Sequence, residues 1–497
     1  MGFSEELSLT LRAFIELSGC DAALVYTLKA PKIVLVQPKD GRTTRELLEF
    51  TYWVTRNPRL EPGREVRQLL RLNVDQTTWP GRVALARNCM RLTEANLKDP
   101  ELKDWVQELR KTDRLLRYKT KTTMLAPLMS PSGELLGVCQ LSNKVARKGQ
   151  TTIPEFDARD ERLMKVFALQ VALLLENQRL LEEQDQLMEG FVNVCVTAVE
   201  SRDHGTAGHS HRVADFTLAL ADSVNRTQAG PMKDIHFSTA EMREMRFAAV
   251  LHDIGKIGVN QNVLMKAKKL YPWEMDVIRM RLNWLHAEIQ LSGYKSGKSV
   301  QEDLERVKLA WKFIDRLNEP TILPQEIMPI LGQFENLLVR ADGLQGIEDV
   351  RAVTEDERFK LSIPRGTLTP EERKEIESHV SHTSEILKQV PWSRNLASVA
   401  EIAGKHHEKL DGSGYPCGCK GDQIPLQSRI ITICDIYDAL AAGDRPYKAS
   451  LSIEKSLEIL AAEVGTGKLD RHLFSVFLEA EVYNLVKTMS PAKKKAS

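Results

Sequence analysis

Histidine and aspartate residues recur at the ends and on the apolar faces of several predicted helices between His209 and Asp435. In "MRFAAVLHDIGK", an apolar helical run carries His252 and Asp253 in its last turn, facing a protein core. An unpaired carboxylate in a core is costly. The chain must therefore fold so that something in that core uses these side chains.

Other predicted helices direct the same residue types inward. In "GHSHRVADFTLAL", three-and-four spacing places His209 among apolar residues. In "LTPEERKEIESHVSHTSEIL", a capping box fixes the start of a helix with His379 on its inner face, whereas His382 is a surface or supporting residue. Two further apolar helices bring His406, His407 and Asp435.

One metal centre explains these residues together, although a single histidine on an apolar face is usually a satisfied core residue. Imidazole and carboxylate without thiolate suit iron, manganese or zinc. Seven ligands are too many for one ion, so we expect two ions bridged by Asp253, an arrangement suited to phosphoester hydrolysis. Lys256, one turn beyond His252, can face a phosphate, with an ordinary solvent-exposed lysine as the alternative.

Composition indicates a soluble, multidomain globular protein. The 497 residues are 42% hydrophobic and 28% charged, and the formal net charge of +1 argues against a nucleic-acid-binding role. We find no signal peptide and no apolar run long enough to span a membrane, so we expect a cytoplasmic protein. Seven cysteines lack framework spacing, and the C-x-C of Cys417 and Cys419 without a partner pair is only a weak indication of zinc.

The sequence pattern predicts four segments. Residues 1–156 read as a mixed α+β domain, 157–197 as a long connecting helix, 198–485 as an all-α domain, and 486–497 as a basic tail. A segment from about 292 to 365 reads as an insertion of additional helices into the all-α domain. In the part that precedes it, "KKLYPWEMDVIRM" resembles an unused copy of "GTLTPEERKEIES", with Arg281 where a histidine would stand.

The connecting helix has a repeating pattern of four and three residues without proline. This pattern predicts a parallel two-stranded coiled coil and hence a homodimer. A helix packed on its own domain is the alternative, which the polar positions in the seam keep open. The predicted seam is Leu163, Phe167, Gln170, Leu174, Asn177, Leu181, Gln184, Met188 and Phe191.

The sequence "HDIGK" from His252 to Lys256, followed by "HHE", "DG" and "GYP" between His406 and Pro416, resembles the HD-GYP family of cyclic di-GMP phosphodiesterases. The resemblance implies a helical bundle with two or three ions, usually iron or manganese, with zinc, nickel or magnesium possible. It implies cleavage of cyclic di-GMP to pGpG or GMP. The implied ligands are His209, His252, Asp253, His379, His406, His407 and Asp435.

The resemblance also implies substrate contacts and a metal count. Lys256, Arg445 and Lys448 would meet the substrate phosphates, and Tyr415 would shape the pocket. Family members with three metals have a glutamate where this chain has Gly205, so we expect two ions.

The N-terminal segment is similar to GAF domains, which are small-molecule sensors. The stretch "LAPLMSPSGELLGVCQLSNK" followed by "EFDARDERLM" carries the resemblance, through Asn143, Lys144, Phe156, Asp160 and Glu161. In GAF domains this motif mainly supports the fold. A cyclic nucleotide is one possible ligand, with another ligand or a purely dimerising role as alternatives.

Together these features predict a GAF-regulated cyclic di-GMP phosphodiesterase. The alternatives are a non-hydrolytic effector that binds the dinucleotide and signals to a partner protein, and a phosphohydrolase acting on mononucleotides. The complete ligand set favours the enzyme.

Overall fold

The computed structural model describes residues 3–29, 47–56, 71–145, 154–203, 208–297, 299–320, 338–339, 350–442 and 450–485. The chain divides into two compact units, Met1–Met188 and Glu189–Ser497, each with its own core. Across the described ranges, no helix has the length and apolar content needed to cross a membrane. Arg445, Lys448, Gly205 and the basic tail lie outside the described residues.

The N-terminal unit is built on a six-stranded antiparallel sheet with strand order β3-β2-β1-β6-β5-β4. Its strands are β1 Cys20–Lys29, β2 Leu47–Thr55, β3 Arg71–Asn73, β4 Met90–Leu92, β5 Thr123–Met129 and β6 Leu135–Lys144. Its helices are α1 Phe3–Ser18, α3 Trp79–Ala86, α4 Lys103–Leu115 and the first part of α5 Ala158–Glu200.

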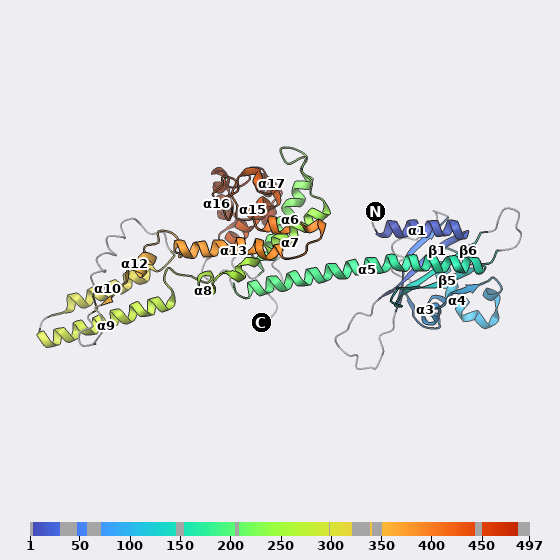
Figure 1. Ribbon diagram of the computed structural model, residues 1–497, viewed down its shortest axis with the longest axis horizontal. Coiled ribbons are helices and arrows are strands. Elements are labelled where there is room, and N and C mark those ends of the chain that lie inside the picture. Colours follow the sequence, from blue (N-terminus) through green and yellow to red (C-terminus); the bar gives the residue numbers. More distant parts are fainter. Residues whose placement is uncertain are drawn as a thin grey trace. The chain divides into compact units, whose positions relative to one another are not determined.

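Helices cover both faces of this sheet because its central strands are apolar on both sides. In β1, Ala23 and Val25 face one core while Leu24 and Tyr26 face the other, as alternation along a strand requires. Helices α1 and α5 pack on the first face, and α3 and α4 on the second (Figure 1). The predicted α+β architecture of this unit is confirmed.

The first half of α5 belongs to the core of the N-terminal unit. Phe167 stacks on Phe14 of α1 with ring centroids 3.8 Å apart, and Leu163 and Leu174 pack against the same core. Here the helix packs on its own domain, which is the alternative that the sequence left open, and these three residues of the predicted seam contribute to that packing. The spacing alone could not separate packing within the unit from packing between two chains.

A different stripe of α5 faces outward. Its apolar side chains recur every seven residues, with Gln170, Asn177, Gln184 and Phe191 at the intervening positions. The exposed fractions are 64% for Val166, 40% for Leu173, 53% for Leu180, 75% for Leu187 and 68% for Val194. The helix therefore presents a heptad pattern that keeps Gln170, Asn177, Gln184 and Phe191 of the predicted seam. In place of Phe167, Leu174, Leu181 and Met188 it uses the residue before each.

The C-terminal unit is a helical bundle. Its main helices are α6 His209–Arg226, α7 Thr239–Leu251, α8 Gln261–Leu264, α13 Pro370–Lys388, α14 Val399–Ala403, α15 Leu426–Ala441, α16 Ile453–Gly465 and α17 Arg471–Glu479. A short 3₁₀ helix, Ile254–Gly258, follows α7 and packs on α13. The predicted all-α architecture of this bundle is confirmed.

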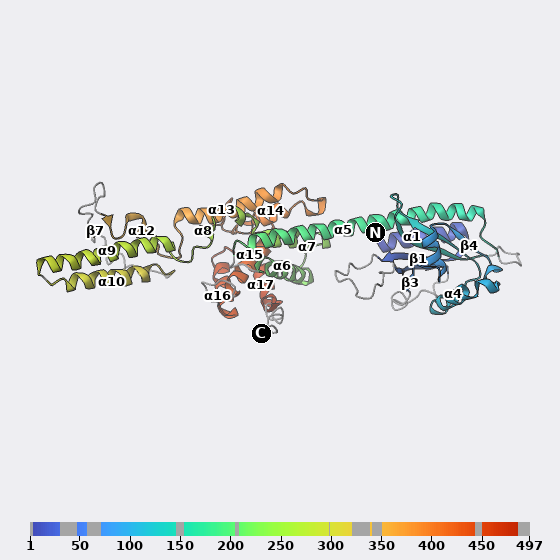
Figure 2. The ribbon, with the colours of Figure 1, turned by 90° about the horizontal axis from the view of Figure 1, so that it is seen from below.

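An additional group of helices lies between α8 and α13. It consists of α9 Pro272–Ser296, α10 Gln301–Leu317 and α12 Glu355–Leu361, with the short strands β7 Leu338–Val339 and β8 Val350–Arg351. Helices α9 and α10 lie side by side (Figure 2), and a separate core joins Ile278, Ile314 and Leu361. The sequence predicts that the insertion starts near residue 292, but this position lies inside α9. The separate core already includes Leu270, so the inserted group begins earlier than predicted.

Candidate metal centre

Close backbone packing between the end of α7 and α13 brings His252 and His379, two predicted metal ligands, near each other. The Gly255 N–H donates to Thr383 Oγ1 at 2.9 Å, and the Thr383 hydroxyl donates to the His252 carbonyl at 2.9 Å. A Cβ on Gly255 would lie only 1.9 Å from the His379 carbonyl oxygen. The glycine of "HDIGK" is therefore needed for the close approach of these two backbones.

Asp253 lies between two groups of histidines. Its Oδ2 is 3.4 Å from His252 Nε2 and 3.8 Å from His209 Nε2, whereas its Oδ1 is 3.3 Å from His379 Nε2. Asp435 reaches the same place from α15, with Oδ1 3.2 Å from His209 Nε2. His209, His252 and His379, which come from different helices, thus meet at the carboxylate of Asp253.

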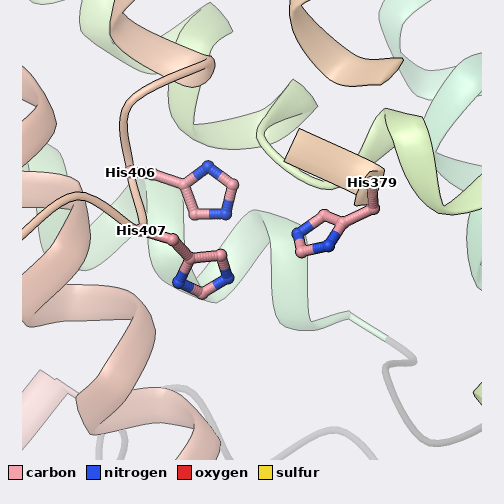
Figure 3. Close-up of side chains that lie close together, drawn as sticks. All are labelled: His379, His406 and His407. Carbon is pink, nitrogen blue, oxygen red and sulfur yellow. The ribbon is translucent and has the colours of Figure 1, made fainter. Parts of the chain in front are cut away.

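The remaining histidines complete the cluster. His379, His406 and His407 offer ligand atoms within 4.8 Å of one another, as do His209, His252 and Asp253, and His252, His406 and Asp435. Figure 3 shows the rings of His406 and His407, from one segment, on the same side as the ring of His379, which comes from another segment. All seven predicted metal-ligand positions are therefore brought together.

The orientation of three imidazoles fits them to hold metal ions. The Nδ1 atoms of His252, His379 and His406 lie 2.6, 2.5 and 2.6 Å from carbonyl oxygens of their own segments. Donation from Nδ1 leaves the lone pair on Nε2, and these Nε2 atoms are buried without a hydrogen-bond partner in the part of the chain that is described. Buried unpaired acceptors are costly, and a bound ion would satisfy them.

Electrostatics keep several of these groups in the form that binds metal. Burial lowers the pKa of His407 to about 4, and burial together with His407 holds the pKa of His406 well below its usual range. Both imidazoles are thus neutral at pH 7. Although burial opposes ionisation of Asp253, Lys256 and His252 hold the pKa of its carboxyl well below its usual range.

His209 is positioned by a carboxylate that sequence reasoning missed. Its Nδ1 lies 2.7 Å from Asp438 Oδ2, and Arg212 Nε donates to the other oxygen of Asp438 at 2.8 Å. Burial opposes the charge on His209, but Asp435 and Asp438 raise its pKa to about 9. Asp438 follows Asp435 by three residues on α15, and this spacing could have identified it as a residue that orients a ligand.

Lys256 lies at the edge of the cluster. Its Nζ is 2.9 Å from Asp253 Oδ2 and 3.0 Å from Asp203 Oδ2. Burial disfavours its charge, but these two carboxylates raise its pKa above the usual value. Lys256 is therefore protonated at neutral pH. Asp203, which sequence reasoning did not single out, holds it in place.

Tyr415 forms part of the wall of the cluster. Its ring centroid is 4.9 Å from that of His407 and 6.5 Å from that of His379. The neighbouring Gly414 is required here, because a Cβ would lie 2.3 Å from the backbone nitrogen of Lys409. His382 does not join the cluster, and its ring packs against Gly258 instead.

The predicted sensor motif ties the sheet of the N-terminal unit to α5. Asn143, at a positive φ of 56°, accepts the Lys121 N–H at 2.6 Å through its side chain. Lys144 forms an ion pair with the buried Asp160, and Phe156 is buried in the core. Glu161 pairs instead with Lys165 at 3.0 Å and Arg91 at 3.3 Å. These contacts give the motif a structural role.

Comparison with known families agrees with the division of the chain into an N-terminal α+β unit and a C-terminal helical unit. A GAF domain profile matches residues 3–175, and HD domain profiles match residues 206–309 and 355–473. The first HD match contains His209, His252 and Asp253, and the second contains the other four clustered residues. Since these side chains meet at one centre, the two matches are parts of a single bundle.

Several curated bacterial proteins are similar to this chain. It is 42% identical over 115 residues to the 3'3'-cGAMP-specific phosphodiesterase 3 of Vibrio cholerae serotype O1, covering 23% of this chain and 24% of that protein. It is 27% identical over 300 residues to a probable cyclic di-GMP phosphodiesterase of the same organism, covering 60% and 46%. It is 39% identical over 112 residues to the cyclic di-GMP phosphodiesterase response regulator RpfG of Xanthomonas campestris pv. campestris, covering 21% and 29%.

The matched regions span 24% and 46% of the two Vibrio relatives' lengths, so the likeness concerns domains. HD domains are metal-dependent hydrolases, and the clustered histidines and aspartates lie within the HD matches. The chain thus combines a GAF domain with an HD domain, in keeping with its resemblance to the HD-GYP proteins.

Proposed function

We propose that the chain is a metal-dependent phosphodiesterase that hydrolyses cyclic di-GMP to pGpG or GMP under the control of its GAF domain. The observation that carries this proposal is the set of buried Nε2 atoms beside Asp253 and Asp435 that have no hydrogen-bond partner among the described residues. The activities for which the relatives are named support a cyclic dinucleotide as substrate. Because some relatives are named for 3'3'-cGAMP, that dinucleotide is the second candidate substrate.

The seven clustered residues would hold two divalent ions, with iron or manganese favoured by the mixture of imidazole and carboxylate. Such ions supply Lewis acidity for phosphoester hydrolysis. Asp253 directs its two oxygens toward different histidine groups, which supports a bridging role. His209 would be kept in orientation by Asp438.

The other proposed residues act on the substrate. The ammonium of Lys256 would meet a substrate phosphate and stabilise the charge that develops during hydrolysis. Tyr415, whose ring packs beside His407, would form the wall against which the dinucleotide lies. Arg445 and Lys448 would add further phosphate contacts, as the HD-GYP resemblance implies.

Replacing Asp253 by Ala tests the central claim. The variant should lose most of its bound metal and all hydrolysis, because the two oxygens of Asp253 approach different histidines, His252 and His379, and alanine offers no ligand atom to either. Metal analysis of anaerobically purified protein, together with chromatography of the products from cyclic di-GMP and 3'3'-cGAMP, measures both effects. Retained turnover with full metal content would contradict the proposal, and tight dinucleotide binding without turnover in the metal-loaded natural chain would favour the effector.

We also infer that the chain forms a parallel homodimer through the outward stripe of α5. The partner of this stripe is a second copy of the chain. An exposed heptad pattern over five successive repeats can pair in register with the same pattern on that copy. The polar residues Gln170, Asn177 and Gln184 weaken any single packing of the pair. A change in that packing would let the GAF domain control hydrolysis, whether its ligand is a cyclic nucleotide or another small molecule.

Two adjacent leucines distinguish this stripe from the seam predicted by spacing alone. Leu180 lies on the stripe and Leu181 beside it, and both are exposed. Leu180→Glu should give a monomer by light scattering, whereas Leu181→Glu should remain dimeric. A monomeric natural chain, or equal effects of the two substitutions, would refute the interface.

A further inference from the structure

A second group of ligand-type side chains lies outside the histidine cluster, in the loop that follows His407. Glu408 is only 2% exposed, and its two carboxylate oxygens accept the N–H groups of Cys417 at 2.7 Å and Cys419 at 2.8 Å. Gly418 between the cysteines has a φ of 67°, which turns the chain sharply. The buried carboxylate therefore holds both cysteines on one side of the loop.

The three side chains are close enough to share one ion. The two Sγ atoms and a carboxylate oxygen of Glu408 lie within 4.8 Å of one another. In a tetrahedral zinc site with Zn–S bonds of about 2.3 Å, two sulfurs are about 3.8 Å apart. A separation of at most 4.8 Å can reach this spacing through small rotations of the side chains, because Cys417 is exposed and Cys419 partly exposed.

The donor atoms differ in kind from those of the histidine cluster. The seven clustered residues offer only nitrogen and oxygen, whereas this group offers two sulfurs. Thiolates select thiophilic ions such as Zn²⁺. The C-x-C alone lacked a partner in sequence, and the fold supplies one through Glu408.

We propose that Glu408, Cys417 and Cys419 form a separate site for Zn²⁺ or another thiophilic divalent ion, with solvent in the remaining position. An ion bound there would join the two ends of the loop from residue 408 to residue 419. That loop carries Tyr415, which packs beside His407. Occupancy of this site would therefore stiffen the wall of the histidine cluster.

Cobalt spectroscopy tests the proposal on the full chain. The protein is stripped of metal with a chelator, kept reduced with a phosphine and titrated with Co²⁺. We expect a sulfur-to-cobalt charge-transfer absorption whose final amplitude corresponds to one thiolate-bound ion per chain, beyond the ions that the histidine cluster takes up, and which is bleached by Zn²⁺. The histidine cluster cannot produce this absorption from its nitrogen and oxygen ligands, so the readout is independent of hydrolysis.

Variants assign the absorption to these residues. It should disappear in the double variant Cys417→Ser/Cys419→Ser and persist in Cys89→Ser, whose thiol is partly buried elsewhere. Circular dichroism checks that the double variant is folded. Absence of the absorption in the natural chain, or its survival in the double variant, would overturn the site while leaving the proposed phosphodiesterase untouched.

Discussion

Helices α9 and α13 begin in the same way but serve different purposes. Each has a proline at its first position. Two residues later a glutamate accepts the N–H of the residue that precedes the proline, at 2.8 Å for Glu274 and 2.9 Å for Glu372. Nine residues beyond each proline stands Arg281 in α9 and His379 in α13. Arg281 pairs with the buried Glu357 at 2.7 Å, whereas His379 lies 3.3 Å from Asp253.

The comparison shows that a local pattern fixes where a helix starts but not what its inner face meets. Glu357 comes from α12 of the inserted group, and Asp253 comes from the end of α7. One pairing is a structural ion pair and the other is part of a ligand cluster. The resemblance of the two helices therefore does not extend to their chemistry.

Placing each residue type at the other position should give the largest difference between the two helices. His379→Arg should abolish hydrolysis and lower metal content, because the cluster loses an imidazole and gains a cation. Arg281→His should keep metal content and turnover but destabilise the inserted helices, because Glu357 loses its partner in a buried position. Metal analysis, turnover and amide hydrogen exchange measure these outcomes, and loss of turnover in Arg281→His would contradict the separation.

Lys256 should show an intermediate effect. Lys256→Ala should retain the metals yet slow turnover by roughly 10²–10³, the scale for losing one electrostatic contact to a transition state. Lys256→Arg, which keeps the charge, should recover part of the rate. If Lys256→Ala loses its metals instead, the lysine supports the ligands through Asp253 and does not act on the phosphate.

Replacing a buried lysine of the inserted group, Lys269, should have the smallest effect of these changes. Its pKa is lowered, whereas that of Lys256 is raised. Lys269 is fully buried, its ammonium donates to the Leu361 carbonyl at 3.1 Å, and burial lowers its pKa to about 8. The unfolded chain then binds more protons between pH 8 and the ordinary lysine pKa of about 10.4, so stability should rise with pH in that window.

Lys269→Met removes this buried charge. At pH 7 the variant should exchange the amide hydrogens of α9 and α10 more slowly than the natural chain, and the difference should shrink as the pH rises toward 10. Because intrinsic exchange accelerates with pH, the two chains are compared at each pH. A difference that grows with pH would show that the ammonium stabilises the group.

Much of the ligand cluster was predictable because each residue has a local signature. His209 and His379 lie on the apolar faces of helices, and His252 and Asp253 end an apolar run, so helical spacing alone directs them inward. Asp438 and Asp203 were missed. Their importance depends on which ligand or lysine lies opposite them, and no local spacing gives that information.

The sequence by itself determined the helix starts, the inward-facing histidines and the two domain classes, because caps, periodicity and motifs act over a few residues. Only the tertiary structure decided which face of α5 turns outward, since Phe167 and Leu180 belong to overlapping heptad patterns and the packing of Phe167 on Phe14 separates them. It likewise brought Glu408 to the two cysteines and Glu357 to Arg281. Contacts between distant segments depend on how whole elements pack, which no short stretch of sequence encodes.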